Sequence, residues 1–258
     1  MSPERSSTIA AEKRTNAALA HGDLQSFIDA RAAVTTPRPP TTARVVALNK
    51  GPWVEAPPPL RQVTDCCKAT VLDVRSADLF GAGHVQGAIN VPVDGASFAT
   101  RAGFVLDPDE RIVLHASSQN EAERAARGLR AVGFLELDAF VTDVETTERI
   151  EAVDIADLER LMEDGSVQVL DVREKDERDT GYIPGSVHMP YRLLRACAAD
   201  CIENGKTIVT ICESGMRASI AASVLATKGI DARPVLHGGV PAWEARGGHT
   251  VEFRRCGA

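Results

Sequence analysis

The chain has 258 residues, of which 44% are apolar, and its 29 basic and 36 acidic residues give it a net charge of −7. Because no block of basic residues offers a surface to phosphates or anionic lipids, nucleic acid and membranes are excluded as partners. No apolar run reaches the roughly 18 residues of a membrane helix, and the start of the chain is charged where a secretory signal would be apolar. The sequence therefore predicts a cytoplasmic protein of one or two domains.

The six cysteines are too few and too irregularly spaced for the disulfide framework of a small secreted protein, so we expect free thiols. Aromatic residues make up only 4% of the chain, and aliphatic side chains must therefore fill the core. This composition is typical of a parallel sheet covered by helices and predicts an α/β fold.

The first part of the chain differs in composition from the rest. Residues 1–36 predict one helix that is too short to bury a core of its own. Seven of the 14 prolines lie between Pro37 and Pro59, which indicates an extended connector around a short strand at Arg44 to Leu48. We therefore interpret residues 1–54 as an N-terminal extension and Pro-rich connector.

The rest of the chain contains an internal repeat. Residues 71–92, VLDVRSADLFGAGHVQGAINVP, align without gaps on residues 169–190, VLDVREKDERDTGYIPGSVHMP, with nine identities in 22 positions. Chance would give about one or two, so a unit of about 100 residues is duplicated. A second block, residues 111–134, aligns on residues 207–230. The repeat predicts a first domain over residues 55–148 and a second over residues 149–258.

Each copy has the pattern of successive βα units. A strand is followed by a turn and short helix, a Gly-rich connection, a helix, a second strand and an Ala-rich helix. In the second copy this last helix carries alanines at helical spacing and ends at Gly229. We therefore predict two domains, each a parallel sheet flanked by helices.

The candidate chemistry lies where the two copies differ. In the second copy the strand at residues 207–211 leads into Cys212-Glu213-Ser214-Gly215-Met216-Arg217, and a helix is predicted from about Arg217. If the loop curls around the sulfur, the backbone N–H groups of residues 213–217 point inward and the helix N-terminus adds its positive end. Such surroundings favour a nucleophilic thiolate and would bind an anion.

At this point the second copy resembles a known family. The segments LDVRE, GYIPGSVHMP, CESGMRAS and LHGGVPAWEARG, in this order over about residues 151–250, are similar to the rhodanese sulfurtransferase domain. The resemblance implies that Cys212 accepts sulfane sulfur as a persulfide and passes it to a thiol or cyanide, without metal or organic cofactor. It places Glu213, Ser214, Gly215 and Met216 around the bound group.

The resemblance also suggests roles for neighbouring residues. Arg217 would brace the loop or hold the donor's anionic group, and both roles stay open. Asp171 and Arg173 would be fold residues. Gly238, Gly239 and Trp243 match the family's C-terminal signature, which we interpret as packing.

Two features of the loop bear on the substrate. Four residues separate Cys212 from Arg217, one fewer than in the phosphatases that share this fold, which favours sulfur transfer. In the family a basic residue after the cysteine suits thiosulfate, whereas Glu213 should oppose a small dianion. We therefore expect a persulfide carried by a thiol as the donor and a thiol as the acceptor.

The first copy has the same predicted elements but lacks the cysteine and the arginine. Ala116 aligns with Cys212, and Glu121 aligns with Arg217. Gln119 and Asn120 stand at the intervening positions, and the glycine pair is replaced by LDAFVTD. We predict no sulfur transfer in the first domain, which would be a structural partner.

Residues 12–19 and 37–52 resemble the end of the metallo-β-lactamase-like domain that precedes rhodanese repeats in persulfide-dioxygenase-like fusions. The metal-binding run H-x-H-x-D-H is absent from the sequence, so no dioxygenase activity is predicted. The resemblance suggests a separately encoded persulfide dioxygenase as a partner.

Other motifs have simpler interpretations. Cys197 and Cys201 could form a resolving pair on one helical face, although ordinary burial is the simpler expectation. His84 and His188 are predicted to be structural. The alternatives to a sulfurtransferase are a non-catalytic sulfide or redox sensor or docking module, in which Cys212 is modified but does not turn over, and a phosphatase or arsenate reductase.

Overall fold

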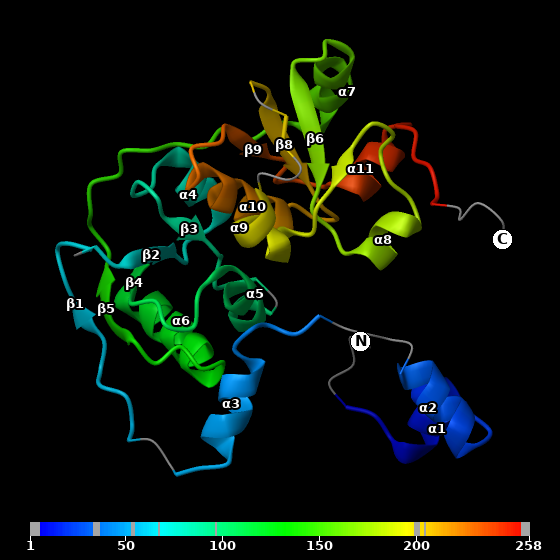
Figure 1. Ribbon diagram of the computed structural model, residues 1–258, viewed down its shortest axis with the longest axis horizontal. Helices are drawn as coiled ribbons and strands as arrows, with labels where there is room; N and C mark the ends of the chain where they lie inside the picture. Colours follow the sequence, from blue (N-terminus) through cyan, green and yellow to red (C-terminus); the bar gives the residue numbers. More distant parts are fainter. Residues whose placement is uncertain are drawn as a thin grey trace. The chain divides into compact units, whose positions relative to one another are not determined.

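The computed structural model of the chain describes residues 6–32, 37–52, 55–66, 68–95, 97–198, 202–203 and 205–253. The chain divides into two compact units, residues 1–38 and residues 39–258 (Figure 1). None of the described helices is long and apolar enough to cross a membrane.

The first unit contains more helix than the sequence predicts. Instead of one helix it forms α1 (Ile9–Thr15), the short 3-10 helix η1 (Ala17–Leu19) and α2 (Leu24–Ala32). Asn16 causes the break, because it leaves the helical region and accepts a hydrogen bond from the N–H of Ala18 at 2.9 Å. None of these helices has a buried residue, which agrees with the prediction that this segment forms no core.

The connector also differs from its prediction. The expected strand at Arg44 to Leu48 is wrong, because Thr42–Asn49 form helix α3. Arg44 anchors this helix to the first domain by an ion pair with Asp109 at 2.7 Å and a hydrogen bond to the carbonyl of Pro108. The β-branched run thus adopts a helix because tertiary contacts override its local preference.

The first domain is built on a five-stranded parallel sheet in the order β1-β5-β4-β2-β3. Its strands are β1 (Arg61–Gln62), β2 (Thr70–Asp73), β3 (Ile89–Asn90), β4 (Ile112–His115) and β5 (Leu137–Val141). Its helices are α4 (Ala77–Ala82), α5 (Phe98–Val105) and α6 (Gln119–Ala131).

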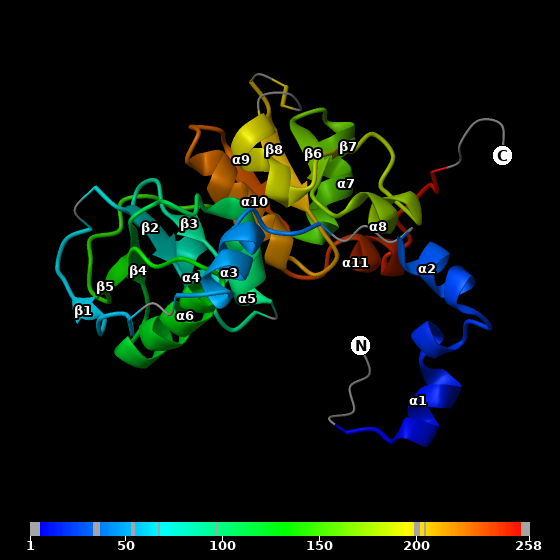
Figure 2. The same cartoon turned by 60° about the horizontal axis from the view of Figure 1, so that its bottom comes forward.

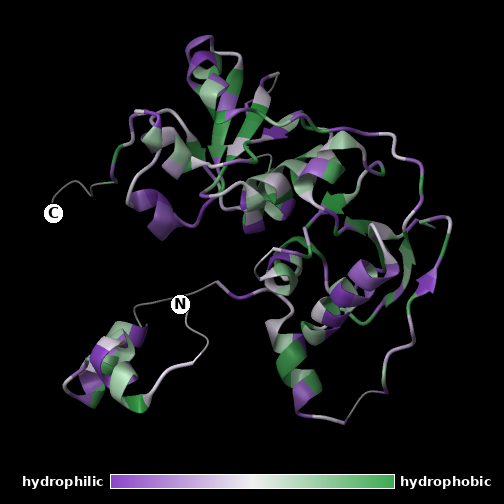
Figure 3. Ribbon diagram, turned by 180° about the vertical axis from the view of Figure 1, so that it is seen from behind, coloured by the Kyte–Doolittle hydropathy of each residue, from purple (hydrophilic) through white to green (hydrophobic). Residues whose placement is uncertain are grey.

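The second domain repeats this arrangement with a four-stranded parallel sheet in the order β7-β6-β8-β9. Its strands are β6 (Val167–Asp171), β7 (Val187–His188), β8 (Thr207–Ile211) and β9 (Ala232–Pro234). Its helices are α7 (Ile155–Glu163), α8 (Lys175–Asp179), η2 (Tyr191–Leu193), α9 (Leu194–Cys197), α10 (Met216–Ala226) and α11 (Val240–Ala245). The predicted α/β fold with two parallel sheets is confirmed. In Figure 3 the strands are predominantly hydrophobic, whereas the surface helix α8 is hydrophilic.

The repeated LDVR motif makes the same buried contact in both copies. Arg173 forms an ion pair with Asp171 at 2.7 Å and donates to the carbonyl of Gly181 at 2.7 Å. Arg75 does the same with Asp73 at 2.6 Å and the carbonyl of Gly83 at 2.8 Å. Because each arginine ties a strand end to the Gly-rich connection, the motif has the predicted role in the fold.

Helix α10 lies between the two sheets and joins the domains into one core (Figure 2). It contacts both β8 of its own sheet and β3 of the first domain. The Ser219 hydroxyl donates to Asn90 Oδ1 at 3.0 Å, and the Asn90 N–H donates to Ser223 Oγ at 3.0 Å. The helix that follows the candidate nucleophile is therefore held by the first domain as well as the second.

Candidate functional site

Cys212 lies at the carboxyl end of β8, a strand that pairs with β6 on one side and β9 on the other. The loop that follows is short, and α10 begins at Met216, one residue earlier than predicted. In parallel sheets, ligand sites form at this edge, where the strands end and the helices begin. The thiol consequently faces the N-terminus of an 11-residue helix, whose partial positive charge favours an anion.

The loop bends back toward the sulfur, and of the predicted amides of residues 213–217 that of Gly215 makes the hydrogen bond. The N–H of Gly215 donates to Cys212 Sγ at 3.1 Å. Gly215 has φ +96°, and a Cβ at this position would lie 1.7 Å from the carbonyl oxygen of Leu236. Only glycine fits here, so the residue type sets the bend that brings an amide onto the sulfur.

The glycine pair of the C-terminal signature supports the loop from behind. A Cβ on Gly239 would lie 2.1 Å from the carbonyl oxygen of Cys212, and the next N–H, that of Val240, donates to the same oxygen at 2.9 Å. The β9–α11 connection thus packs directly against the backbone of the candidate nucleophile, and this contact gives the segment its predicted packing role.

Cys212 is enclosed, with 1% of its surface exposed. The side chains of Glu213 and Ser214, in contrast, are exposed on the outside of the loop. Cys212 therefore offers little of its surface to a ligand.

Arg217 connects the start of α10 to α8. Its guanidinium forms two hydrogen bonds with the Glu177 carboxylate, Nη1 to Oε2 at 2.5 Å and Nη2 to Oε1 at 2.6 Å, and lies 3.7 Å from Glu213. Burial lowers the pKa of Arg217, but the hydrogen bonds and charge of Glu177, together with the charges of Cys212 and Glu213, outweigh burial and raise it. The contacts favour the loop-bracing role among the two that the sequence left open.

Sequence reasoning missed Glu177. Burial raises the pKa of its carboxyl group, but the hydrogen bond and charge of Arg217 outweigh burial and leave the pKa below its usual value of 4.5. A local signal exists, because Glu177 lies in α8, directly after the LDVRE motif. Its pairing with a residue 40 positions away required the fold.

We expect Glu177→Gln to lower the rate of sulfur transfer several-fold and the free energy of unfolding by about 1 kcal/mol, since the pair is partly exposed and screened. The depressed pKa means that the stabilisation is present above pH 4.5 and is lost as the pH falls below it. Urea denaturation of wild type and variant at pH 7 and pH 3.5 measures the difference in the free energy of unfolding above and below this pH. Glu159→Gln, at an exposed position of α7, is the matched control. An unfolding difference that persists at pH 3.5 would contradict this explanation.

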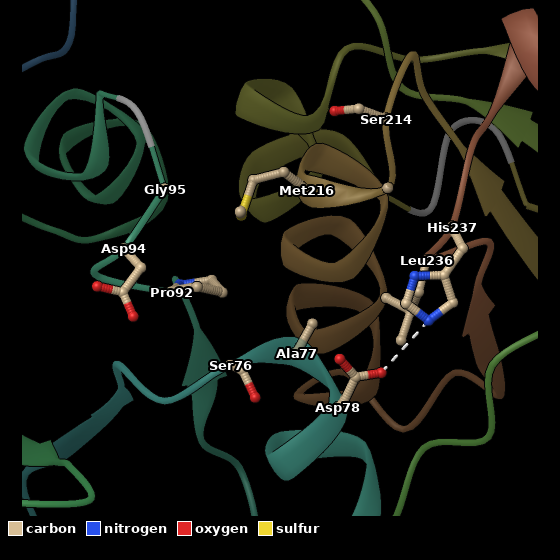
Figure 4. A pocket seen from close by; sticks show the side chains of 11 residues that line it. Ser76, Ala77, Asp78, Pro92, Asp94, Gly95, Ser214, Met216, Leu236 and His237 are labelled. Atoms are coloured by element: carbon tan, nitrogen blue, oxygen red, sulfur yellow. Dashed lines mark ion pairs between the residues drawn. The ribbon is translucent and has the colours of Figure 1, made fainter.

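A pocket of about 310 Å³ adjoins the loop and is formed by both domains (Figure 4). Ser214, Gly215 and Met216 line it, whereas Glu213 is not among its lining residues, and substrate binding by these residues stays a prediction. The other lining residues are Leu236 and His237 of the second domain and Ser76, Ala77, Asp78, Pro92, Asp94 and Gly95 of the first. The sequence predicted only a structural role for the first domain and did not indicate this contribution.

The corresponding loop of the first domain has no thiol. Ala116, fully buried, occupies the position of Cys212. Glu121, in place of the arginine, accepts a hydrogen bond from the N–H of Ser117, while Ser118 caps α6 by accepting from the N–H of Glu121. A carboxylate of the chain itself therefore accepts from one amide of this loop, and the inactivity of the first domain stays a prediction.

The remaining predicted residues have structural contacts or lie outside the described part of the chain. His84 contacts the carbonyl of Phe80 and His188 that of Arg173, both at 2.9 Å, as predicted for structural histidines. Cys197 is half-buried in α9, and Cys201 lies outside the described residues, so their pairing stays a prediction. Among the residues that the structure describes, no cluster of three or more His, Cys, Asp or Glu side chains could hold a metal ion.

Comparison with known proteins places these features in a family. The model of the rhodanese-like domain matches residues 57–143 and again residues 154–246, together more than half of the chain. The chain is 39% identical over 66 residues to a Bacillus subtilis (strain 168) protein named "Putative sulfur carrier protein YrkF", a match that covers 26% of the chain and 35% of the relative. The chain thus spans about a third of the length of that relative.

Two solved structures illustrate the likeness. A rhodanese-related protein from Thermoplasma volcanium is 29% identical and matches 40% of this chain and 99% of its own, with a TM-score of 0.37. Thiosulfate sulfurtransferase from Pseudomonas aeruginosa is 19% identical and matches 72% of this chain and 40% of its own, with a TM-score of 0.32.

Proposed function

Because the chain belongs to the rhodanese-like domain family, which matches it in two successive segments, we propose that it is a sulfurtransferase whose second domain works through a persulfide on Cys212. The observation that carries the proposal is the hydrogen bond from the Gly215 N–H to Cys212 Sγ at the start of α10. A backbone amide and a helix N-terminus on one sulfur stabilise its ionised form, which is the nucleophile.

The reaction is a two-step relay. In the first step the Cys212 thiolate attacks the outer sulfur of a donor R–S–SH, the donor's S–S bond breaks and R–S⁻ leaves. In the second step an acceptor thiolate or cyanide attacks the same sulfur, and the electron pair of the Cys212–S bond returns to the Cys212 thiolate. The relay transfers one sulfur atom and needs no external oxidant or reductant.

The surroundings of the loop favour a persulfide carried by a thiol over thiosulfate. Glu213, whose side chain is 66% exposed, places a carboxylate at the position next to the nucleophile. This charge opposes the approach of a small dianion. Glutathione persulfide, in which the reacting sulfur is separated from the carboxylates, is the donor that we propose.

Mass spectrometry of the intact protein tests the proposal. Incubation with glutathione persulfide should add one sulfur, about 32 Da, to Cys212, and a second incubation with thiol or cyanide should remove it in a single turnover. Wild-type protein that never acquires the added sulfur on Cys212 would refute the proposal. A thiosulfate kcat/KM far above that for glutathione persulfide would refute the choice of donor.

A second candidate is a sensor that holds its sulfur, and the 1% exposure of Cys212 is the observation that favours it. The second step separates the two functions, because a sensor would retain the persulfide after the acceptor is added. A phosphatase or arsenate reductase would need a wider loop than the four residues between Cys212 and Arg217.

The partner suggested by the N-terminal resemblance remains part of the proposal. A separately encoded persulfide dioxygenase of the metallo-β-lactamase fold would share the same substrate class, a persulfide on a small thiol. Sulfite formation from glutathione persulfide by such an enzyme should change when this protein is added.

A further inference from the structure

Helix α5 of the first domain packs against the second domain beside the Cys212 loop. The rings of Phe104 and Tyr191 meet edge to face with their centroids 6.0 Å apart. Arg195 of α9 donates to the carbonyl of Val105 at 2.7 Å and forms an ion pair with Glu110. These contacts fix α5 against η2 and α9, so side chains on this helix have defined positions relative to the second domain.

Arg101 extends from α5 to Gly95, one of the residues that line the pocket. A Cβ built on Gly95 would lie 3.1 Å from Arg101 Nη1 and 2.9 Å from Met216 Cε, so the guanidinium and the first residue of α10 approach the same glycine. Figure 4 shows the Met216 side chain directed from α10 toward Gly95 and Asp94. The first domain thereby brings a cation next to the loop of the candidate nucleophile.

The two arginines near Cys212 differ in their partners. Glu177 and Glu213 neutralise Arg217. Asp94, the acidic residue next to Gly95, is ion-paired with Arg124 at 2.6 Å. Within the part of the chain that the structure describes, no carboxylate forms an ion pair with Arg101. Arg101 is therefore the cation at this site whose charge remains available to a ligand.

The surroundings of Arg101 disfavour its positive charge until an anion binds beside it. Burial lowers the pKa of Arg101, while negative charge on Cys212 would raise it and the charge of Arg217 lowers it further. Burial also raises the pKa of Tyr191 to about 12, so its phenol stays neutral beside the guanidinium. A half-buried cation without a carboxylate partner interacts with an anion more strongly than one in bulk water does.

We propose that Arg101 of the non-catalytic first domain is a specificity residue, which binds the carboxylate of a thiol persulfide while its outer sulfur approaches Cys212. This inference rests on the proposed function of Cys212. It gives the first domain a direct part in donor recognition in addition to the structural role that the sequence predicts.

Alkylation of Cys212 by a charged and a neutral reagent tests the proposal. Iodoacetate carries a carboxylate and iodoacetamide does not, and both attack the same thiolate. In Arg101→Gln we expect Cys212 to react about tenfold more slowly with iodoacetate and less than twofold more slowly with iodoacetamide, as read from the Cys212 peptide by mass spectrometry. Arg101→Lys should retain most of the preference, since the positive charge remains.

The control is Arg127→Gln, which removes the same charge from an exposed position of α6 and should leave both rates unchanged. An Arg101→Gln protein with an unchanged ratio of the two rates would overturn the inference, as would equal slowing by both reagents, which marks a structural role. The proposed function fails separately, if wild-type Cys212 accepts no sulfur from glutathione persulfide.

Discussion

Replacing Cys212 with serine should lower sulfur transfer from glutathione persulfide by about a thousandfold or more, because removal of a covalent nucleophile leaves only binding and electrostatic effects. The equivalent loop of the first domain offers no substitute, because it has Ala116 in this position and Glu121 accepts a hydrogen bond from the N–H of Ser117. Steady-state turnover with cyanide or thiol as the acceptor measures the loss.

The cysteine substitution needs a fold control and a thiol control. Serine is close to cysteine in size, so circular dichroism and the thermal midpoint should show that the enclosed site still folds. Cys197→Ser removes a half-buried thiol elsewhere in the second domain and should leave turnover within about twofold of wild type. Full activity in Cys212→Ser would identify another cysteine as the nucleophile and would remove the basis of the proposed mechanism.

Gly239→Ala should have the largest effect on stability. The new methyl group would lie 2.1 Å from the carbonyl oxygen of Cys212 and 2.6 Å from that of Glu213, and φ at this position is +100° with ψ −153°. Since backbone rather than a flexible side chain meets the methyl group, the loop must shift. We expect a loss of about 3 to 5 kcal/mol in the free energy of unfolding and sulfur transfer reduced by two orders of magnitude or more.

The matched control for this prediction is Gly229→Ala. Gly229 also has a positive φ, +74°, but nothing lies within 4 Å of the Cβ that alanine would add. Its cost should be about 1 kcal/mol, the cost of the backbone conformation alone, with sulfur transfer retained. Urea denaturation of the two variants separates backbone strain from collision with the loop. Equal losses in both would show that the contact between Gly239 and Cys212 does not matter.

Local patterns were sufficient for most of the fold. Neighbouring residues specify each of the two LDVR strands, the Gly-rich connections and the Ala-rich helix. Each motif alone is weak evidence, but the duplication shows the pattern twice. The connector was predicted wrongly for the opposite reason. Val45 and Val46 are β-branched, yet the anchor of Arg44 on Asp109 places them in α3. The preference of these side chains for a strand is smaller than the free energy of docking α3 on the first domain.

The residues of the site also differ in whether the sequence alone could identify them. Cys212 and Gly215 could be identified from the sequence because a nucleophile, a turn and a helix start lie within a few residues, and each makes its contact inside that segment. Glu177 and Arg101 could not be identified, because a carboxylate or a guanidinium is ordinary on any surface helix. Their significance comes from partners that are distant in the chain.

By itself the sequence determined that this protein contains two related α/β domains, that the second has Cys212 at a strand-to-helix turn and that the first has Ala116 at the equivalent position. Only the tertiary structure decided which charges surround that thiol, how α10 is held between two sheets and that the first domain contributes to the pocket. The physical reason is the range of the interactions. Hydrogen bonds within a turn depend on a few consecutive residues, whereas burial and ion pairing depend on the packing of segments that are far apart in the chain.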